Sequence, residues 1–363
     1  MPIKILPARL LFVGLLTLLI SCQKTPVAQV YQQQLFAFGT LIDISIVTKN
    51  SQQAQDAISE ISSEFDRLHT QWHPWQGGEL ALVNQQLPAL KAIAISNELA
   101  ELIKQSQTLS QQSEGLFDPA IGKLIRLWQF DQLEKDNFQF HLPSPKAIQS
   151  IVDSKPEMAN LKLFKNAANR SFLQSDNPSV ILDFGAFAKG VAIEKMLTIL
   201  KAHHIDNALI NAGGDLKVTG SKNQHPWRIG IKNPQNAQDP SQPAILAAIQ
   251  LNSGEALFTS GDYERFFIAN GRHYHHIIDP RNGYPGQGVR AVTILDTDAG
   301  RADAAATAIF LAGPKKAMNI ARKMGVTHLL LIDSDNHIYL SPAMAKRLEL
   351  LTENSTSIFS THD

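Results

Sequence analysis

The order of hydrophobic and polar residues divides the first third of the chain into a strand and a helix. Alternating apolar residues at Ile42, Ile44 and Ile46 predict a strand within 35–48. The next stretch repeats apolar residues at the three- and four-residue spacing of one helix face, which predicts an amphipathic helix over 51–69. The residues on that face are Ala54, Ile58, Ile61, Phe65 and Leu68. No such period runs through 70–95, and we expect this stretch to be irregular.

Three polar residues predict where further helices begin. Ser96 can cap a helix that runs to about Gln112. Asp118 is followed by proline, a pair that predicts an N-cap and the first residue of a short helix through Trp128. Ser144, also followed by proline, predicts another helix start in the same way.

From about residue 161 onward, short apolar runs separated by turn residues predict strands mixed with helices. We expect strands over 161–166, 171–174, 180–185, 208–218, 227–232, 245–251, 256–260, 265–278, 289–295, 327–332 and 337–340. We expect helices over 187–202, 301–311 and 314–324. Strands and helices do not alternate strictly, so the pattern predicts the α+β class and one compact domain over 34–351. The polar residues 352–363 predict a frayed tail.

The N-terminus has the pattern of a bacterial lipoprotein signal. Lys4 and Arg9 precede an apolar run over 10–20, which is too short for a stable membrane span. The run ends in Leu-Ile-Ser and then Cys22, which resembles a lipobox. In that signal the cysteine is lipidated and becomes the first residue of the mature protein. The alternative is an ordinary signal peptide with an incidental cysteine.

These signals predict the location of the protein. We expect a signal peptide over 1–21, a polar tether over 22–33 and a lipid anchor on Cys22 that holds the chain to a bacterial membrane, facing the periplasm. Gln23 follows the cysteine, where an aspartate would be associated with inner-membrane retention, so the outer membrane is favoured.

Composition excludes some classes of protein. The 33 lysines and arginines balance 33 aspartates and glutamates, so the chain lacks the basic charge of a nucleic-acid-binding protein. A hydrophobic content of 44% is typical of a globular protein. Cys22 is the only cysteine, so no internal disulfide can form and the core must supply the stability.

Two glycine-containing segments are candidates for ligand contact. In ILDFGAFAKG (181–190) a predicted strand ends at Asp183, and a helix begins shortly before Lys189. Free N–H groups at a helix start suit a phosphate. The alternative is a plain strand-to-helix turn, which has the same sequence pattern. In NAGGD (211–215) the paired glycines predict either close approach of a ligand or another backbone, or a tight bend.

The segment ADAAAT (302–307) is a candidate for cation binding. Asp303 and Thr307 are four residues apart on a predicted helix and share one face. A carboxylate and a hydroxyl suit a hard cation such as Mg²⁺. The alternative is an aspartate that interacts favourably with the dipole near the helix start.

Three histidines in RHYHHIIDPRNG (272–283) suggest a transition metal at first sight. On a strand, however, His273 and His275 would face one side and His276 the other, so the three cannot converge on one ion. We therefore expect no zinc or copper site. A single histidine at a strand end, beside the turn over 279–283, can instead act as an acid or a base.

Taken together and in order, these segments resemble the ApbE family of flavin transferases. The motifs are Phe38-Gly39-Thr40, LDFGAFAKG (182–190), NAGGD (211–215), TSGDYER (259–265), HHIIDPRNG (275–283), and Ala302-Asp303 with Thr307. The resemblance implies binding of Mg²⁺ and of FAD as a substrate. It further implies transfer of FMN from FAD to a threonine of a target flavoprotein through a phosphoester bond, with release of AMP. The acceptors would be subunits of membrane redox complexes.

The resemblance also implies a role for individual residues. FAD contacts would fall on Phe38, Trp72, Leu116, Phe117, Asp118, Asp183, Lys189 and Ile277. Metal contacts would fall on the backbone carbonyl of Ala186 and on Asp303 and Thr307. His276 would be the catalytic residue.

The sequence departs from the family pattern at three positions. Phe38 stands where methionine is usual, Asn282 where threonine is common, and Ala306 where some relatives have an acidic residue. The last change would leave the metal site with one ligand fewer. Two other functions use part of the same pattern: an FAD-binding lipoprotein without turnover, and a pyrophosphatase that splits FAD into FMN and AMP.

Overall fold

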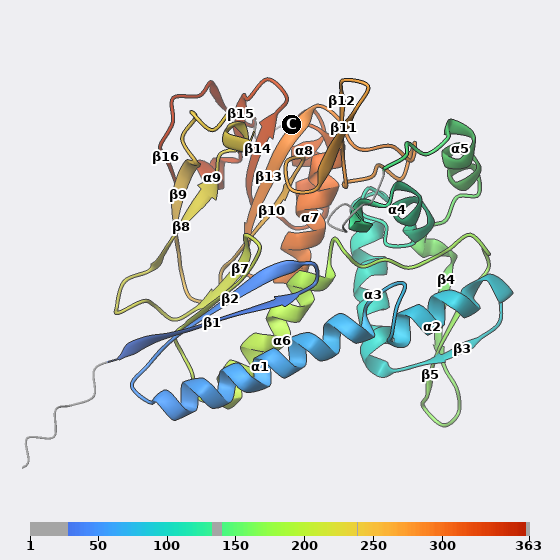
Figure 1. Cartoon of the computed structure of the whole chain (residues 1–363), viewed down its shortest axis with the longest axis horizontal. Coiled ribbons are helices and arrows are strands. Elements are labelled where there is room, and N and C mark those ends of the chain that lie inside the picture. The colour runs from blue at the N-terminus through green and yellow to red at the C-terminus, as the bar shows by residue number, and fades with distance from the viewer. Residues whose placement is uncertain (1–27, 133–139, 238, 361–363) are drawn as a thin grey trace, which may run out of the picture.

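A mixed nine-stranded sheet forms the centre of the molecule (Figure 1). The computed structural model describes residues 28–132, 140–237 and 239–360, so the predicted signal peptide, Cys22 and the start of the tether lie outside it. Neighbouring strands are antiparallel except for the last pair, which is parallel. The order across the sheet is β1 (Gln29–Ala37), β2 (Thr40–Thr48), β6 (Ala208–Ala212), β7 (Asp215–Thr219), β10 (Ala256–Gly261), β13 (Val289–Asp296), β14 (His328–Asp333), β15 (Ile338–Leu340) and β17 (Thr356–Ile358).

Helices cover one face of this sheet and form the main core. They are α1 (Ser51–Gln71), α6 (Ala188–Ala202), α7 (Ala299–Ala312) and α8 (Ala317–Lys323). The predicted apolar face of α1 is buried at Ala54, Ile61, Phe65 and Leu68, and Ile58 is half-buried. Helix α7 is buried along almost its whole length because its alanines let it lie close to the sheet.

A small second sheet covers the opposite face of the central sheet. It consists of β8 (Trp227–Lys232), β9 (Ile245–Leu251) and β16 (Leu348–Leu350), with α9 (Pro342–Ala345) beside it and the 3₁₀ turn η4 (Pro234–Ala237) after β8. Trp227 and Leu251 of this sheet pack with Leu257 and Leu330 of the central sheet in a separate apolar cluster. The middle strands of the central sheet are therefore buried on both faces.

The remaining elements lie beside the helical layer. They are α2 (Glu79–Gln86), η1 (Leu87–Ala89), β3 (Ile93–Ile95), α3 (Asn97–Gln112), α4 (Gly122–Trp128), η2 (Phe130–Gln132), α5 (Pro145–Asp153), η3 (Met158–Asn160), β4 (Leu161–Lys165), β5 (Ser171–Ser175), β11 (Phe266–Ala269) and β12 (Arg272–His275). A third apolar cluster joins α4, α5 and the β11–β12 hairpin through Trp128, Ile148 and Tyr274. The α+β prediction is confirmed.

Several local predictions are also confirmed. The side chain of Ser96 caps α3 by accepting from Leu99 N, and that of Ser144 caps α5 by accepting from Ala147 N. Helices α6, α7 and α8 occupy the predicted segments to within a few residues at each end.

Three segments that we predicted as single strands are hairpins. Strands β1 and β2 turn at Phe38–Gly39, β6 and β7 at Gly213–Gly214, and β11 and β12 at Asn270–Gly271. All these turn residues have positive φ, so the chain reverses within two residues and the period-two pattern continues almost unbroken. The glycine pair is thus a tight turn. Strand β1 begins at Gln29, inside the predicted tether.

Four other predictions need correction. The stretch 70–95 contains α2 and β3. Asp118 caps no helix, because α4 starts only at Gly122. The stretch 180–185 is no ladder strand and makes only an isolated bridge, between Ile181 and Ile121. The predicted tail pairs with β15 through Thr356–Ile358 and buries Phe359, so it is frayed at none of these residues.

Candidate active site

Lys189 lies at the start of α6 and forms an ion pair with Asp215, the first residue of β7. The other carboxylate oxygen of Asp215 accepts a hydrogen bond from Thr259 N of β10 at 2.9 Å. Burial lowers the pKa of Lys189, but the nearby charges of Asp215, Asp303 and Glu264 outweigh burial and hold the pKa above its ordinary value. The ammonium is therefore charged and fixed in place.

Asp303 of α7 is buried beside this ion pair. Its Oδ2 accepts a hydrogen bond from Gly190 N at 3.0 Å. Gly190 permits the contact because a Cβ at this position would lie 2.3 Å from Ala299 O, so a side chain here would force α6 and α7 apart. Burial raises the pKa of Asp303 to about 7, a shift that Lys189 opposes and Asp215 increases.

The donors in this region fit a hard divalent cation. Thr307 lies one helical turn after Asp303, and its Oγ1 is 3.1 Å from Ser260 Oγ. Two buried carboxylates, Asp215 and Asp303, lie near the single ammonium of Lys189, so ionisation of Asp303 leaves an excess of negative charge. Oxygen donors with excess negative charge suit Mg²⁺. Among the described residues, no three His, Cys, Asp or Glu side chains are grouped as metal ligands, so such an ion would need hydroxyl, carbonyl or substrate oxygens.

The histidines adopt different environments. His275 is buried, donates from Nε2 to Gly286 O at 2.8 Å and accepts at Nδ1 from Ile277 N at 3.2 Å. Both of its ring nitrogens are therefore engaged within the protein, and burial lowers its pKa to about 4. The half-exposed ring of His273 lies against that of Phe266, tilted by 32°, with ring centroids 4.6 Å apart.

His276 lies just past the end of β12, so the strand that we predicted through it stops one residue earlier. Its backbone N donates to Arg265 O at 3.1 Å. Its Nδ1 is buried and has no hydrogen-bond partner among the described residues. Burial and the charge of Arg265 lower the pKa of this histidine to about 3. The imidazole is therefore neutral and has an uncommitted buried nitrogen.

The tip of the β1–β2 hairpin is tied to the same place. Arg265 donates through Nη2 to Gly39 O at 3.0 Å. Phe38 N donates to His69 Nδ1 at 3.1 Å, and the Phe38 ring lies 6.4 Å from that of Trp72. Two residues assigned to FAD by resemblance, Phe38 and Trp72, are thus brought together by α1.

The other predicted FAD residues lie on adjoining loops. Asp183 N donates to Pro119 O at 2.8 Å, which places the Asp183 turn, with Ala186 beyond it, against the loop that carries Asp118. Leu116, Phe117 and Ile277 are buried in the main core. Their side chains therefore serve packing, and a ligand would meet the surface of the loops that they hold.

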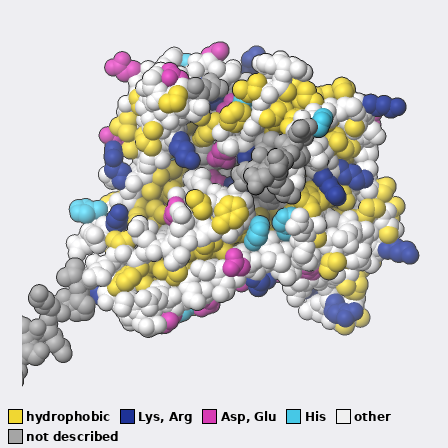
Figure 2. All heavy atoms as spheres, viewed as in Figure 1, with side chains coloured by type: hydrophobic (Ala, Val, Ile, Leu, Met, Phe, Trp, Pro, Cys, Tyr) yellow, Lys and Arg dark blue, Asp and Glu magenta, His cyan; other side chains and the backbone are white. Residues whose placement is uncertain are grey.

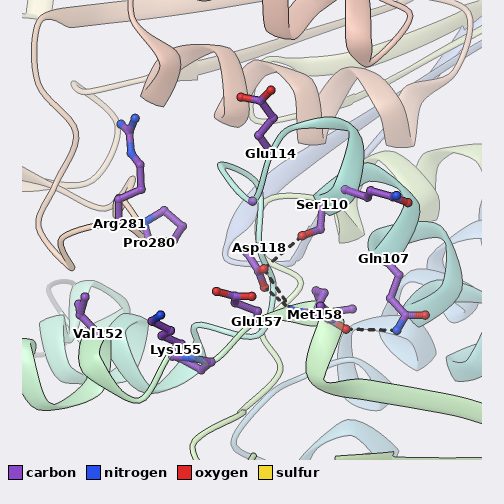
Figure 3. Close-up of a pocket in the computed structure, with 14 residues that line it drawn as sticks. Gln107, Ser110, Glu114, Asp118, Val152, Lys155, Glu157, Met158, Pro280 and Arg281 are labelled. Atoms are coloured by element: carbon purple, nitrogen blue, oxygen red, sulfur yellow. Dashed lines mark hydrogen bonds between the residues drawn. The ribbon is translucent and has the colours of Figure 1, made fainter.

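A cavity of about 660 Å³ opens beside Asp118 (Figure 3). The Asp118 carboxylate accepts from Ala120 N, Met158 N and Ser110 Oγ, so it joins three segments instead of capping a helix. Burial raises its pKa to about 6. The opposite wall of the cavity includes Arg281, from the turn that follows His276 in the chain.

A second, wider groove of about 960 Å³ lies between α3, α6 and α7 and includes Trp72. Neither hollow is lined by Lys189, Asp303 or His276. The sequence motifs pointed to these three residues. Ser260 and Arg265 lie in the TSGDYER motif, but the sequence assigned them no role, and no motif included Met158; their contacts appear only in the three-dimensional arrangement.

Residues 38–330 match the model of the ApbE family. The chain belongs to the ApbE family. It is similar to a protein named FAD:protein FMN transferase from Rhodobacter capsulatus, with 36% identity over 314 residues, 86% of this chain and 57% of that protein. It is also similar to the FAD:protein FMN transferase of Treponema pallidum, with 27% identity over 348 residues, 91% of this chain and 92% of that one.

Solved ApbE structures have the same fold. The ApbE protein of Thermotoga maritima superimposes with a TM-score of 0.76 and 30% identity, over 88% of this chain and 99% of that one. The apo flavinyl transferase ApbE of Pseudomonas stutzeri superimposes with a TM-score of 0.71 and 26% identity, over 84% and 92% of the two chains. The Rhodobacter capsulatus relative extends well beyond the segment that this chain spans.

Proposed function

We propose that this ApbE-family chain is an FAD:protein FMN transferase that moves FMN from FAD to a threonine of an acceptor flavoprotein. The acceptor oxygen forms a bond to the phosphorus of the FMN half, and the pyrophosphate bond breaks. AMP leaves with that electron pair, and the hydroxyl proton passes to the protein. The observation that carries this proposal is His276, a neutral imidazole with a buried nitrogen that bonds to no other group in the part of the chain that the structure describes.

His276 is the proposed base for the hydroxyl proton. Its pKa of about 3 belongs to the protein without substrate, where burial and Arg265 disfavour the cation. The negative charges of a pyrophosphate nearby would favour the imidazolium and raise this pKa. The basicity of His276 would therefore increase when FAD is bound.

Lys189 and the carboxylates hold the substrate phosphates in this proposal. Lys189 is positioned by Asp215 and can bind a phosphate oxygen. Asp303, Thr307 and the carbonyl of Ala186 are the proposed ligands of Mg²⁺, which when bound would neutralise charge on the pyrophosphate. Ser260, next to Thr307, orients that hydroxyl. The acceptor threonine would approach beside His276.

We further propose that Cys22 carries a lipid anchor at a membrane facing the periplasm, and that the acceptors are subunits of membrane redox complexes. Both proposals rest on the sequence signals and the resemblance. In the part of the chain that the structure describes, no helix is long and apolar enough to cross a bilayer. A Cys22→Ser variant should leave the membrane fraction while its FAD binding stays unchanged.

One assay tests the proposed activity. The protein is incubated with FAD, Mg²⁺ and a protein extract of its source, and the products are separated by denaturing gel and chromatography. Flavin fluorescence on a protein band, with AMP release, supports transfer. Free FMN with AMP identifies a pyrophosphatase, and unchanged FAD identifies a binding protein.

A pair of variants isolates the proposed metal site. Asp303→Asn keeps an acceptor for Gly190 N but removes the charge, so transfer should fall by about 10²–10³-fold. Asp298→Asn, at the start of the same helix, removes an acidic residue that caps α7, and asparagine caps equally well. Its transfer rate should stay within about twofold, and equal losses in both variants would contradict the metal role.

A further inference from the structure

Strand β1 is an open edge of the central sheet. It stands first in the strand order and pairs only with β2. The pairing runs without a register shift from Gln29–Thr48 to Ala37–Thr40. Among the described residues, no strand lies on the other side of β1. Its outer backbone groups are therefore available to another chain.

The register identifies these groups. The pair Ala37–Thr40 closes a two-residue turn, so its two residues exchange hydrogen bonds, and every second pair along the ladder does the same. The backbone N–H and C=O groups of the alternate residues Val30, Gln32, Gln34 and Phe36 consequently point away from β2. They recur at about 7 Å, the repeat of an extended partner strand.

This edge lacks the features that usually block strand addition. Natural edges carry charges, prolines or bulges, or are short. Strand β1 reads QVYQQQLFA over nine residues, with no charged residue and no proline, and its ladder has no bulge. The Gln33 side chain bonds to Gln34 O, a single contact that a partner strand could replace. An unprotected edge of this length indicates a binding surface.

The edge leads directly to the proposed site. Its last residue, Ala37, precedes the Phe38–Gly39 turn, which Arg265 holds beside His276. Near that end, Phe36 and Leu41 form a cross-strand pair whose side chains are 60% and 51% exposed. Hydrophobic side chains lie open to solvent over this hairpin in Figure 2. An extended polypeptide on β1 would be delivered to the site with an apolar anchor next to the reacting hydroxyl.

We infer that an extended segment of the acceptor protein adds to the free edge of β1 and so brings its hydroxyl to the site. This inference rests on the proposed function, which requires that a polypeptide, not a small molecule, reach the site. Backbone pairing supplies affinity that depends little on sequence, and the exposed Phe36–Leu41 pair near the tip can select an apolar side chain of the partner. The uncharged glutamines of β1 suit a partner strand of either charge.

Proline substitution tests the edge without disturbing the hairpin. The outward N–H of Gln34 bonds to no strand, so Gln34→Pro removes a donor from the edge but leaves the β1–β2 ladder intact. Gln34→Ala is the matched control, because it also loses the side-chain bond to Asp43 but keeps the backbone N–H. The substrate is the purified protein that becomes flavin-labelled in the transfer assay, at saturating FAD and Mg²⁺.

The Gln34→Pro variant should raise KM for the acceptor about tenfold, as expected for a lost hydrogen bond and a steric block. The FAD dissociation constant should be unchanged, and Gln34→Ala should stay within about twofold of the wild type. Phe36→Ser should also raise KM for the acceptor. Hydrogen exchange at Gln32 and Gln34 should slow when the acceptor is added to the wild type.

Other outcomes would overturn the inference. Wild-type transfer with unaltered KM in Gln34→Pro excludes the edge while the proposed function stands. Loss of self-association in sedimentation, with transfer unchanged, would assign the edge to a second copy of the chain. Loss of binding to phosphatidylglycerol vesicles, with transfer unchanged, would assign it to a membrane. If the wild type labels no protein, the proposed function fails and the docking role fails with it.

Discussion

The β1–β2 and β11–β12 hairpins have the same turn conformation, but the turn costs more conformational free energy in the β1–β2 hairpin. Asn270 and Gly271 have φ of 51° and 71°, and Phe38 and Gly39 have φ of 52° and 69°. Asparagine adopts this left-handed region readily, whereas a bulky residue such as phenylalanine does so at a cost of about 1–2 kcal/mol. The Asn270–Gly271 tip is exposed, and nothing lies within 4 Å of a Cβ built on Gly271. The Phe38–Gly39 tip is held by His69 and Arg265.

This difference indicates where the fold accepts strain for another purpose. A phenylalanine in a glycine-like conformation persists only because its surroundings hold it there, and such positions cluster at functional sites. In the β1–β2 hairpin the residue proposed to contact FAD, Phe38, is at the tip. In the β11–β12 hairpin the tip is free, and His276 follows the base of the second strand.

The largest expected effect on transfer activity is at His276, at the base of the β11–β12 hairpin. His276→Asn should lower single-turnover transfer at saturating FAD by about 10²–10⁴-fold, the usual range for a general base, with a much smaller change in FAD affinity. His273→Asn is the control, because that half-exposed ring contacts, among the rings that the structure describes, only those of Phe266 and His275, and it should cost less than tenfold. Equal losses in both variants, together with zinc or copper retained by the wild type, would favour a metal cluster.

The two turn glycines give the next test. A Cβ at Gly39 would lie 2.6 Å from Arg265 Nη2, whereas a Cβ at Gly271 meets nothing. Both alanine variants pay the same conformational cost, but only Gly39→Ala displaces Arg265 and the hairpin tip. Transfer should fall by up to about 10²-fold in Gly39→Ala, because a displacement of about 1 Å can cost that much. A similar loss in Gly271→Ala would assign the effect to general destabilisation.

Exchanging the first turn residues should separate stability from binding. Phe38→Asn removes ring contacts with Phe65 and Trp72 but relieves the turn, so unfolding free energy should change by less than about 1 kcal/mol. FAD affinity, measured by flavin fluorescence, should fall about tenfold. In Asn270→Phe we expect a destabilisation of about 1 kcal/mol with unchanged FAD affinity. If Phe38→Asn binds FAD with unchanged affinity, Phe38 does not contact FAD.

The smallest effect concerns His275, whose role in this structure is to hold the chain between β12 and Gly286. Its pKa is lowered to about 4 in the fold, so the unfolded chain takes up a proton at higher pH than the folded chain. The stability that this neutral imidazole contributes is present above about pH 6.5 and is lost as pH falls toward 4. Between pH 7.5 and 5, the difference in unfolding free energy between wild type and His275→Asn should shrink by about 1–2 kcal/mol.

Urea unfolding at the two pH values measures this change. Asp118 acts in the opposite direction, because burial raises its pKa to about 6, but it is present in both proteins and cancels in the difference. A difference that stays constant with pH would mean that His275 has the same pKa in the folded and unfolded chain, which would contradict the lowered pKa. We expect the His275→Asn variant to lose transfer activity only in proportion to the fraction of the protein that unfolds.

Sequence patterns specified local structure well where one physical rule dominates. The apolar period of α1 and the Ser96 and Ser144 caps were read correctly because each depends on residues within one or two turns. The Asn270–Gly271 turn was missed although this pair is a strong hairpin signal, because the apolar alternation continues across it. The Phe38–Gly39 turn could not have been found, since phenylalanine is not a turn residue.

The site could be assembled from sequence only through the family resemblance. Asp303 bonds to Gly190, and Arg265 bonds to Gly39, across long separations in sequence that no local period encodes. For Asp118 the local sequence pattern gave a wrong prediction. Its sequence context predicted a cap, but tertiary contacts with Ser110 and Met158 take its carboxylate instead.

The strand order has a consequence for synthesis of the protein. Strand β2 pairs with β6, and β6 pairs with β7. The proposed site also includes residues of α7, so its residues are spread along the chain from Phe38 to Thr307. Contacts between residues so far apart form late and slowly. A nascent chain that has not yet reached α7 lacks the helix that packs against α6, β10 and β13, so the residues proposed to contact FAD should not yet be assembled and FAD should not stabilise it. Flavin binding would then report completed folding and would stabilise only finished molecules.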